Sequence, residues 1–253
     1  MTPDVVVDIG NTRMKWGRVD GERIEAVAVL GLDDPAAWFA KAVEWTAVPF
    51  GRWTIASVNP KVTASLTDWL RGRSSFAEVV GSHRDVPIQL DVEQPESVGM
   101  DRLFACCAAR NRLAAGAPFL VVQAGTALVV NFVSRAGVFA GGAILPGLSL
   151  MARSLHEHTA LLPEVSLGNT PSNSPGRTTE EAIRTGVYWA AVGAIATLRY
   201  GFGVAAQHKD LTVFLTGGDA ELLVPALGQI ADHQPNLVLE GILSVYYPRP
   251  YDG

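Results

Sequence analysis

The sequence predicts an α/β fold made of two similar lobes that face each other across a cleft. The chain has 253 residues, which is enough for one large domain or for two of about 100 to 150 residues. One pattern of residues occurs twice, about a domain length apart, and the rest of the chain alternates between β-type and helical stretches. We therefore expect an N-terminal lobe over residues 1–115 and a C-terminal lobe over residues 116–253.

The repeated pattern predicts a β-hairpin in each lobe. The first copy, residues 5–21, has a run of valines, a turn at Gly10 with Thr12, a second β-type run and another glycine turn. The second copy, residues 120–137, follows the same order, and its Gly125 comes 115 positions after Gly10. β-Branched runs joined by glycine turns are typical of hairpins with small polar residues at their tips. In a single sequence, chance similarity is the alternative to duplication.

Outside the hairpins, the chain alternates between predicted strands and helices. Helices are expected where alanine, leucine and arginine run without a breaker, and strands where β-branched residues gather before a turn. These criteria predict strands at residues 53–58 and 211–215, and helices at residues 62–70, 102–113 and 179–200. Thr178 or Thr179 is expected to cap the last helix, because Glu180 and Glu181 suit its first turn.

Composition and charge narrow the classes of function. Hydrophobic residues make up 48% of the chain and charged residues 18%, which indicates a sizeable core and excludes a disordered class. The formal charge of −5 disfavours a dedicated nucleic-acid binder, since such proteins carry a basic stripe for phosphates. No apolar run reaches the roughly 20 residues of a membrane helix, and the N-terminus lacks the basic segment of a signal peptide. We therefore expect a cytoplasmic protein.

Three glycine turns carry residues suited to phosphate chemistry. They lie at residues 8–12, 123–126 and 216–219, each after a β-type run. Glycine lets the backbone come close to a ligand, so that its N–H groups can point at phosphate oxygens. Asp8 could hold Mg²⁺ through water, and Lys15 could supply a positive charge to a phosphate tail. Taken alone, each turn is better explained as a structural turn, whereas three in this order favour a nucleotide site.

The order of these turns resembles the two phosphate loops and the adenosine loop of the acetate kinase, sugar kinase, Hsp70 and actin superfamily. That resemblance implies two RNase H-like lobes, the actin-like ATPase fold, with the nucleotide in the cleft between them. Within this superfamily, the chain resembles the type III pantothenate kinases. The matching segments follow the family's order along most of the chain: residues 8–15, 99–102, 141–147, 159–163, 179–183 and 216–220.

The family resemblance implies transfer of the γ-phosphoryl group of ATP to the primary hydroxyl of pantothenate, the first step towards coenzyme A. It implies ATP or phosphate contacts from Asp8, Ile9, Gly10, Asn11, Thr12, Arg13, Met14, Lys15 and Thr126, and adenosine contacts from Gly217 and Gly218. It implies substrate contacts from Gly99, Met100, Asp101, Arg102 and Thr179. The implied ions are Mg²⁺, held by Asp8 through water, and a monovalent cation, K⁺ or NH₄⁺. A homodimer is also implied, and we expect neither a nucleic-acid nor a membrane partner.

Asp101 and Arg102 are the residues expected to handle the acceptor. A carboxylate within hydrogen-bond reach of the hydroxyl can orient it and take its proton, so Asp101 is the candidate catalytic base. The planar guanidinium of Arg102 is well matched to the carboxylate of pantothenate. Without the surrounding motifs, an ion pair at a helix start would be the better explanation of these two residues.

One position departs from the family. The second phosphate loop typically opens with an aspartate that ligates the monovalent cation, and this chain has Gln123 there. A neutral carbonyl oxygen should bind such a cation more weakly than a carboxylate does. Either the cation requirement is relaxed or other oxygens compensate, and a kinase of weakened activity is a further interpretation.

Two other functions compete with this one. Some relatives were first described as accessory factors of transcription, and a regulatory role on the same fold is one alternative. It would normally need an added DNA-binding module, and the first phosphate loop begins at residue 8. The other alternative is a kinase of a different small hydroxylated substrate. Only residues 99–102 and the segment at Thr179 favour pantothenate over such a substrate.

Overall fold

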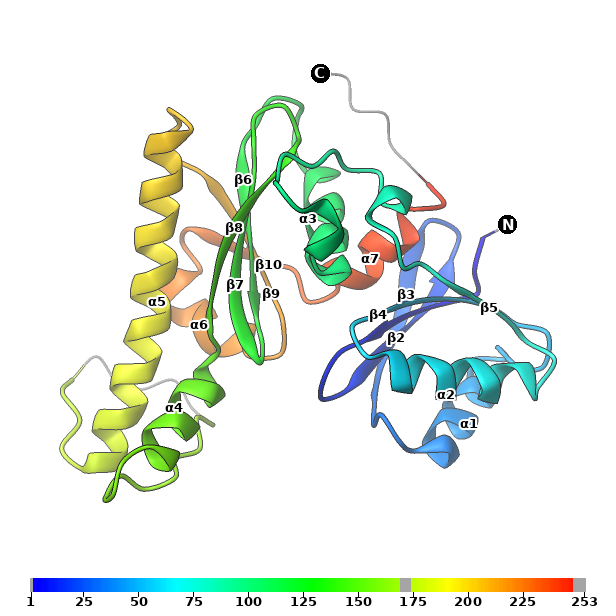
Figure 1. The fold of residues 1–253 in the computed structure, drawn as a ribbon, viewed down its shortest axis with the longest axis horizontal. Helices are drawn as coiled ribbons and strands as arrows, with labels where there is room; N and C mark the ends of the chain where they lie inside the picture. The colour runs from blue at the N-terminus through cyan, green and yellow to red at the C-terminus, as the bar shows by residue number, and fades with distance from the viewer. Residues whose placement is uncertain (1, 169–173, 248–253) are drawn as a thin grey trace. The chain divides into compact units, whose positions relative to one another are not determined.

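The computed structural model describes residues 2–168 and 174–247, and internal contacts divide them into two units (Figure 1). The first unit comprises the chain up to Ala114 together with the segment from Asn236, and the second runs from Ala115 to Pro235. The first boundary lies within one residue of the expected lobe boundary. The expected C-terminal lobe ran on to residue 253, whereas α7 (Leu237–Leu243) packs on β1 (Val5–Ile9) of the first unit.

A five-stranded mixed sheet with the order β3-β2-β1-β4-β5 forms the first unit. Its strands are β1, β2 (Met14–Asp20), β3 (Arg23–Leu30), β4 (Arg52–Ser57) and β5 (Phe76–Val79). The first three strands pair antiparallel, whereas β4 joins β1, and β5 joins β4, in parallel. The hairpin predicted from residue 5 is therefore present, and its second turn leads into β3.

The two faces of this sheet have different roles, because successive side chains of a strand point to opposite faces. The odd-numbered residues of β1 face α1 (Pro35–Glu44) and α2 (Pro60–Arg71). The core on that face contains three tryptophans that are at most 1% exposed: Trp16, Trp38 and Trp53. The even-numbered residues, among them Asp8, lie on the opposite face, where α7 contacts β1 and α3 (Met100–Arg110) contacts β4.

The second unit repeats the arrangement of the first. Its strands are β6 (Phe119–Ala124), β7 (Ala127–Val133), β8 (Phe139–Pro146), β9 (Thr212–Thr216) and β10 (Ala231–His233). They form a sheet with the order β10-β9-β6-β7-β8, in which β6–β7 and β7–β8 are antiparallel and the other two pairs are parallel. Read from the β8 edge, each strand occupies the place of the strand five earlier in the chain. The prediction of two similar α/β lobes is confirmed.

The described residues of the second unit include the helices α4 (Leu148–Glu157), α5 (Thr179–Ala205) and α6 (Ala220–Leu227). The long helix α5 buries residues spaced four apart, Ile183, Val187, Ala191 and Ile195, in one core with the sheet. This spacing gives a helix a single apolar stripe. None of the helices among the described residues is long and apolar enough to cross a membrane.

Helix ends differ from the predicted ones for local reasons. The helix expected at residues 102–113 ends at Arg110, because the backbone then tightens and the N–H of Leu113 donates to the carbonyl of Arg110. The helix expected to end at residue 200 continues to Ala205. Gly203 contributes to this ending, since a Cβ there would lie 2.7 Å from the carbonyl oxygen of His208.

Candidate active site

The turn between β1 and β2 places polar groups at the end of the first sheet. The two strands pair up to Ile9 opposite Met14, which leaves residues 10–13 as the turn. The N–H of Gly10 donates to the carbonyl of Arg13 over 3.1 Å and closes it. A Cβ at Gly10 would lie 3.2 Å from that same oxygen, so the turn favours a residue without a side chain. Residues 11–13 are exposed, and their polar groups can therefore reach a ligand.

Ile9 and Met14 lie differently from the rest of the predicted phosphate segment. Both side chains are fully buried in the tryptophan core on the face of α1 and α2. Only the backbone of these two residues is therefore available to a nucleotide. Their side chains instead fix the two strands that carry the turn.

Asp8 and Lys15 are direct neighbours across β1 and β2. Both are partly buried on the sheet face opposite the tryptophan core. Burial, with a further contribution from the Asp101 carboxylate, raises the pKa of Asp8 to about 7, while Lys15 opposes the shift. Burial also lowers the pKa of Lys15, and Asp8 opposes that shift. Opposite charges held where water solvates them poorly are typical of sites that bind charged ligands.

The start of α3 brings Asp101 to this group. Gly99 precedes the helix as its N-cap, and its carbonyl accepts the N–H groups of Arg102 and Leu103. A Cβ on Gly99 would lie only 2.7 Å from Oδ1 of Asp101, so the carboxylate folds back over this glycine. Asp101 is also near enough to Asp8 for its charge to contribute to the raised pKa there. The two carboxylates, from β1 and α3, therefore belong to one electrostatic group.

Arg102 follows Asp101 and is partly buried, as is Met100 before it. Burial lowers the pKa of Arg102, and the neighbouring Cys106 and Asp101 oppose this shift. Burial raises the pKa of the Cys106 thiol, which is fully buried one turn further along the helix. The side chain of Cys106 therefore belongs to the buried packing of α3 behind Arg102.

Helix α7 packs beside α3 (Figure 1). A side chain at Gly241 would collide with the backbone of Phe104, so the two helices touch closely at this glycine. Oγ of Ser244 lies 3.2 Å from Sγ of Cys107, and Arg112 pairs with Glu240 over 2.7 Å. These contacts fix the helix that carries Asp101.

In the second unit, the second phosphate turn is enclosed by two further glycines. The N–H of Gly147 donates to the carbonyl of Thr126 over 3.0 Å, and a side chain at Gly147 would collide with the backbone of Gly125. Gly217 has φ of +106°, and a side chain there would collide with the backbone of Ala124. The turns predicted for phosphate and adenosine therefore lie against each other. Thr126 in the first turn and Gly218 in the second are both exposed.

Gln123 lies on β6 just before that turn and is held by β7. Its side-chain oxygen Oε1 accepts a hydrogen bond from Nδ2 of Asn131 over 2.9 Å. Asn131 is fully buried, although it is polar and lies within an apolar strand. The oxygen at the predicted cation position is thus already bonded to an amide donor.

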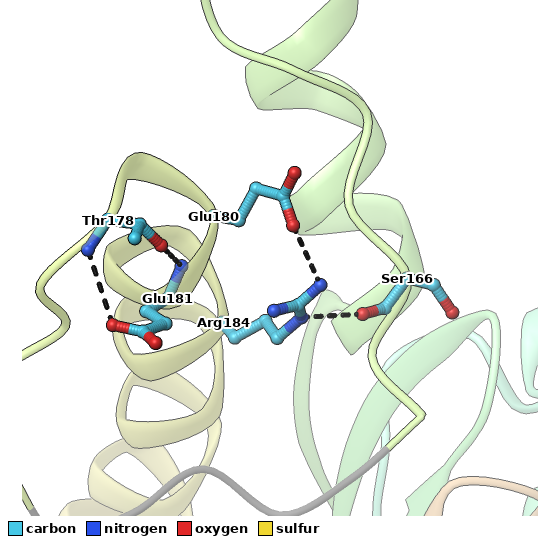
Figure 2. Close-up of polar contacts among 5 residues, drawn as sticks. All are labelled: Ser166, Thr178, Glu180, Glu181 and Arg184. Carbon is cyan, nitrogen blue, oxygen red and sulfur yellow. Dashed lines mark hydrogen bonds and ion pairs between the residues drawn. The ribbon is translucent and has the colours of Figure 1, made fainter.

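Thr179 is the first residue of α5, and its neighbour Thr178 is the N-cap (Figure 2). Thr178 Oγ1 accepts the N–H of Glu181 over 3.2 Å, and the Glu181 carboxylate accepts the N–H of Thr178 over 3.3 Å. One turn on, Arg184 donates to the carbonyl of Ser166 and pairs with Glu180, which ties the start of α5 to residues before it in the chain. The exposed Thr179 is therefore presented on a fixed helix end.

Within the first unit, the fold brings together Asp8, Lys15, Asp101 and Arg102 with the exposed turn at residues 11–13. Thr126, Gly217 and Gly218 form a second group within the second unit. Thr179 lies at the start of α5 in that unit. Among residues 2–168 and 174–247, no cluster of three or more His, Cys, Asp or Glu side chains is arranged to hold a metal ion.

Sequence reasoning did not single out Asn131 as part of a site. A signal for it exists, because Asn131 is the polar residue within the run from Ala127 to Val133. In an antiparallel hairpin, Gln123 pairs with Val129, and the residue two positions further along β7 lies on the same face as both. Counting along the predicted hairpin would have placed Asn131 diagonally opposite Gln123.

Comparisons with known proteins identify relatives of this chain. The family model described as type III pantothenate kinase matches residues 5–199. The chain is 35% identical over 251 residues to the type III pantothenate kinase of Thiobacillus denitrificans, and the alignment covers 94% of each protein. It is 32% identical over 248 residues to that of Gluconobacter oxydans, covering 94% of this chain and 90% of the relative. A 42% identical match to the Rhodopirellula baltica protein of this name covers 65% of this chain and 60% of that protein.

Solved structures with the same fold are more distant in sequence. A Campylobacter jejuni protein described as a Baf family transcriptional activator aligns with a TM-score of 0.64 at 17% identity, covering 96% of this chain and 97% of its own. A Sinorhizobium meliloti protein described as a 2-dehydro-3-deoxygalactonokinase aligns with a TM-score of 0.56 at 12% identity, covering 97% and 99%. At such identities the similarity concerns the fold alone. Together with the duplicated sheets, it confirms the predicted actin-like ATPase fold.

Proposed function

The chain belongs to the type III pantothenate kinase family, and on this premise we propose that it transfers the γ-phosphoryl group of ATP to pantothenate, the first step of coenzyme A synthesis. The single observation that best supports this activity is the group of Asp8, Lys15, Asp101 and Arg102 beside the Gly10 turn. Phosphoryl transfer needs alignment, charge neutralisation and an acceptor for the hydroxyl proton. The side chains of this group can meet all three requirements.

We assign the acceptor side of the reaction to the start of α3. Asp101 takes the proton of the pantothenate hydroxyl as that oxygen attacks the γ-phosphorus. Arg102 pairs with the pantothenate carboxylate, to which its guanidinium can donate two parallel hydrogen bonds. Gly99 leaves room for the Asp101 carboxylate to lie close to the helix start, and Met100 stands between these two residues in the chain. The substrate would thus be held at one end and activated at the other by adjacent residues.

The phosphate side is assigned to the turns. Residues 11–13 offer exposed polar groups to phosphate oxygens, Gly10 closes the turn that carries them, and Lys15 supplies a positive charge beside them. In the second unit, Thr126 is assigned to ATP, and Gly217 with Gly218 to its adenosine part. The support for this assignment is that the two turns lie against each other, at Gly217 and the backbone of Ala124.

Mg²⁺ is the divalent ion that we expect to accompany ATP, and Asp8 suits it. Burial and the Asp101 carboxylate both disfavour the charge of Asp8, and a divalent cation nearby would favour it again. Mg²⁺ keeps several waters and uses phosphate oxygens as ligands, so a single carboxylate reached through water is sufficient. When bound, the ion neutralises charge on the β- and γ-phosphate oxygens.

The remaining assignments concern substrate, assembly and location. Thr179 is proposed to contact pantothenate through its exposed hydroxyl. We further propose a homodimer, because α5 exposes three large apolar or aromatic side chains, Trp189, Tyr200 and Val204. A cytoplasmic location agrees with the substrates, both of which are metabolites.

A coupled assay of ADP formation tests the proposed activity. Wild-type protein with ATP and Mg²⁺ should form ADP in proportion to the pantothenate added. Asp101→Asn should lower kcat by about 10²- to 10⁴-fold, the usual contribution of a general base, while ATP binding is retained. The control is Asp91→Asn, which changes an exposed carboxylate of the same unit and should leave kcat unaffected. Absence of pantothenate-dependent ADP from the wild type would refute the function, and full activity of Asp101→Asn would refute the assigned base.

A further inference from the structure

The amide of Gln123 occupies the position at which the family resemblance implies a monovalent cation. Its Oε1 accepts from Nδ2 of Asn131 over 2.9 Å, so an N–H donor lies within the space around this oxygen. A cation at the same oxygen would approach this donor, whose hydrogen atoms carry partial positive charge. Gln123 also brings no negative charge, whereas hard cations favour carboxylate ligands.

Asn131 has little freedom to move away from this contact. Its side chain is fully buried, and it lies on β7, which pairs with β6 on one side and with β8 on the other. Its partner on β8 is Gly142, where a Cβ would lie 2.9 Å from Cα of Asn131. The β8 backbone therefore leaves no space for a side chain between Gly142 and this part of β7. Releasing the Asn131 amide from Gln123 would leave a buried donor without that bond, which is costly.

A neutral amide pair can take over the structural part of a cation's role. A bound cation would order the oxygen in front of the second phosphate turn, and the hydrogen bond from Asn131 orders it instead. The pair needs no ion to compensate a charge, because neither amide is ionised. The charge of the site therefore does not depend on which monovalent cation the solution contains.

We propose that the Gln123–Asn131 amide pair replaces the monovalent cation in this chain, so that its kinase activity needs neither K⁺ nor NH₄⁺. The inference rests on the proposed function, since it concerns the same site. Asn131 acts in it as a positioning residue, which fixes the Gln123 side chain and has no assigned contact with ATP.

Exchange of KCl for choline chloride at constant ionic strength tests the inference. The wild-type rate of ADP formation should stay within about twofold, since general screening is unchanged between the two salts. Gln123→Asp restores the carboxylate, and its rate in KCl should exceed that in choline chloride by about tenfold, a common size for coupling between two ligands. Gln94→Asp is the matched control, because it makes the same change at an exposed residue of the other unit and should gain no dependence.

Thermal unfolding provides a readout that does not depend on activity. With Mg²⁺ and ATP present, the wild-type Tm should be the same in both salts, whereas KCl should raise the Tm of Gln123→Asp, because a ligand stabilises the state that binds it. A K⁺-specific rise in wild-type Tm, or wild-type turnover only in KCl, would overturn the inference while leaving the kinase function intact. Turnover in neither salt would count against the kinase function, and the Tm comparison would still decide the question of the cation.

Discussion

Adding one methyl group at Gly99 should separate catalysis from stability. In Gly99→Ala, the new Cβ would lie 2.7 Å from Oδ1 of Asp101, and ordinary contact begins at about 3.4 Å. The carboxylate would therefore have to retreat by about 0.7 Å or rotate away. Displacements of about 1 Å in a reacting group can cost about 10²-fold in rate, so we expect kcat to fall by about 10- to 100-fold.

The fold itself should tolerate this change. Gly99 has φ of −57° and ψ of 130°, which alanine adopts without strain, and the atom in the way belongs to the end of a side chain. Replacing glycine at such a position stabilises by about 0.4–1 kcal/mol through the unfolded chain, and the loss of a glycine N-cap offsets part of this. Urea unfolding should thus give a change below about 1 kcal/mol. Gly81→Ala is the control, since its Cβ would meet nothing within 4 Å. An unchanged kcat in Gly99→Ala would refute the idea that this glycine positions the base.

Two further predictions concern Asp8 and the start of α5. The raised pKa of Asp8 means that the folded protein binds its proton more tightly than the unfolded chain, so stability falls as pH rises from about 4 to about 7. Between pH 5 and pH 8, the free energy of unfolding should therefore fall by at least about 1 kcal/mol more in wild type than in Asp8→Asn, and equal falls would contradict the cause given for the shift. Thr178→Ala should destabilise by about 1 kcal/mol through loss of the N-cap and leave KM unchanged. Thr179→Ala should do the reverse, raising the KM for pantothenate by about three- to tenfold with little change in Tm, and the opposite pattern would exchange the two roles.

The sequence was sufficient for the architecture because the architecture is duplicated. The same order of valine run, glycine turn and second β run at Gly10 and Gly125 predicts the same hairpin twice, and both hairpins lie at the centres of their sheets. Local chemistry also predicted a helix start with Thr178 or Thr179 as its cap, since a threonine followed by acidic residues can satisfy the free N–H groups there, and the structure has the cap at Thr178.

Other features depend on contacts between distant parts of the chain and were beyond sequence reasoning. The place of α7 follows from its packing on Phe104 and Cys107, more than 130 residues earlier, and no local pattern encodes that. The proximity of Asp8 and Asp101 is also tertiary, because it requires α3 to begin near the end of β1. The hydrogen bond between Asn131 and Gln123 lies between these two cases. It could be predicted from the strand register, but only after the hairpin had been predicted.

The return of α7 to the first unit has a consequence for synthesis of the protein on the ribosome. Domains generally fold as units while the chain emerges, starting from the N-terminus. The first unit cannot finish in this way, because its last helix is translated after the whole of the second unit. Until then, the buried side of α3 around Phe104 and Cys107 lacks its cover. A nascent or truncated chain would therefore hold Asp101 on an unsupported helix until the segment through Ser244 is available to pack on α3.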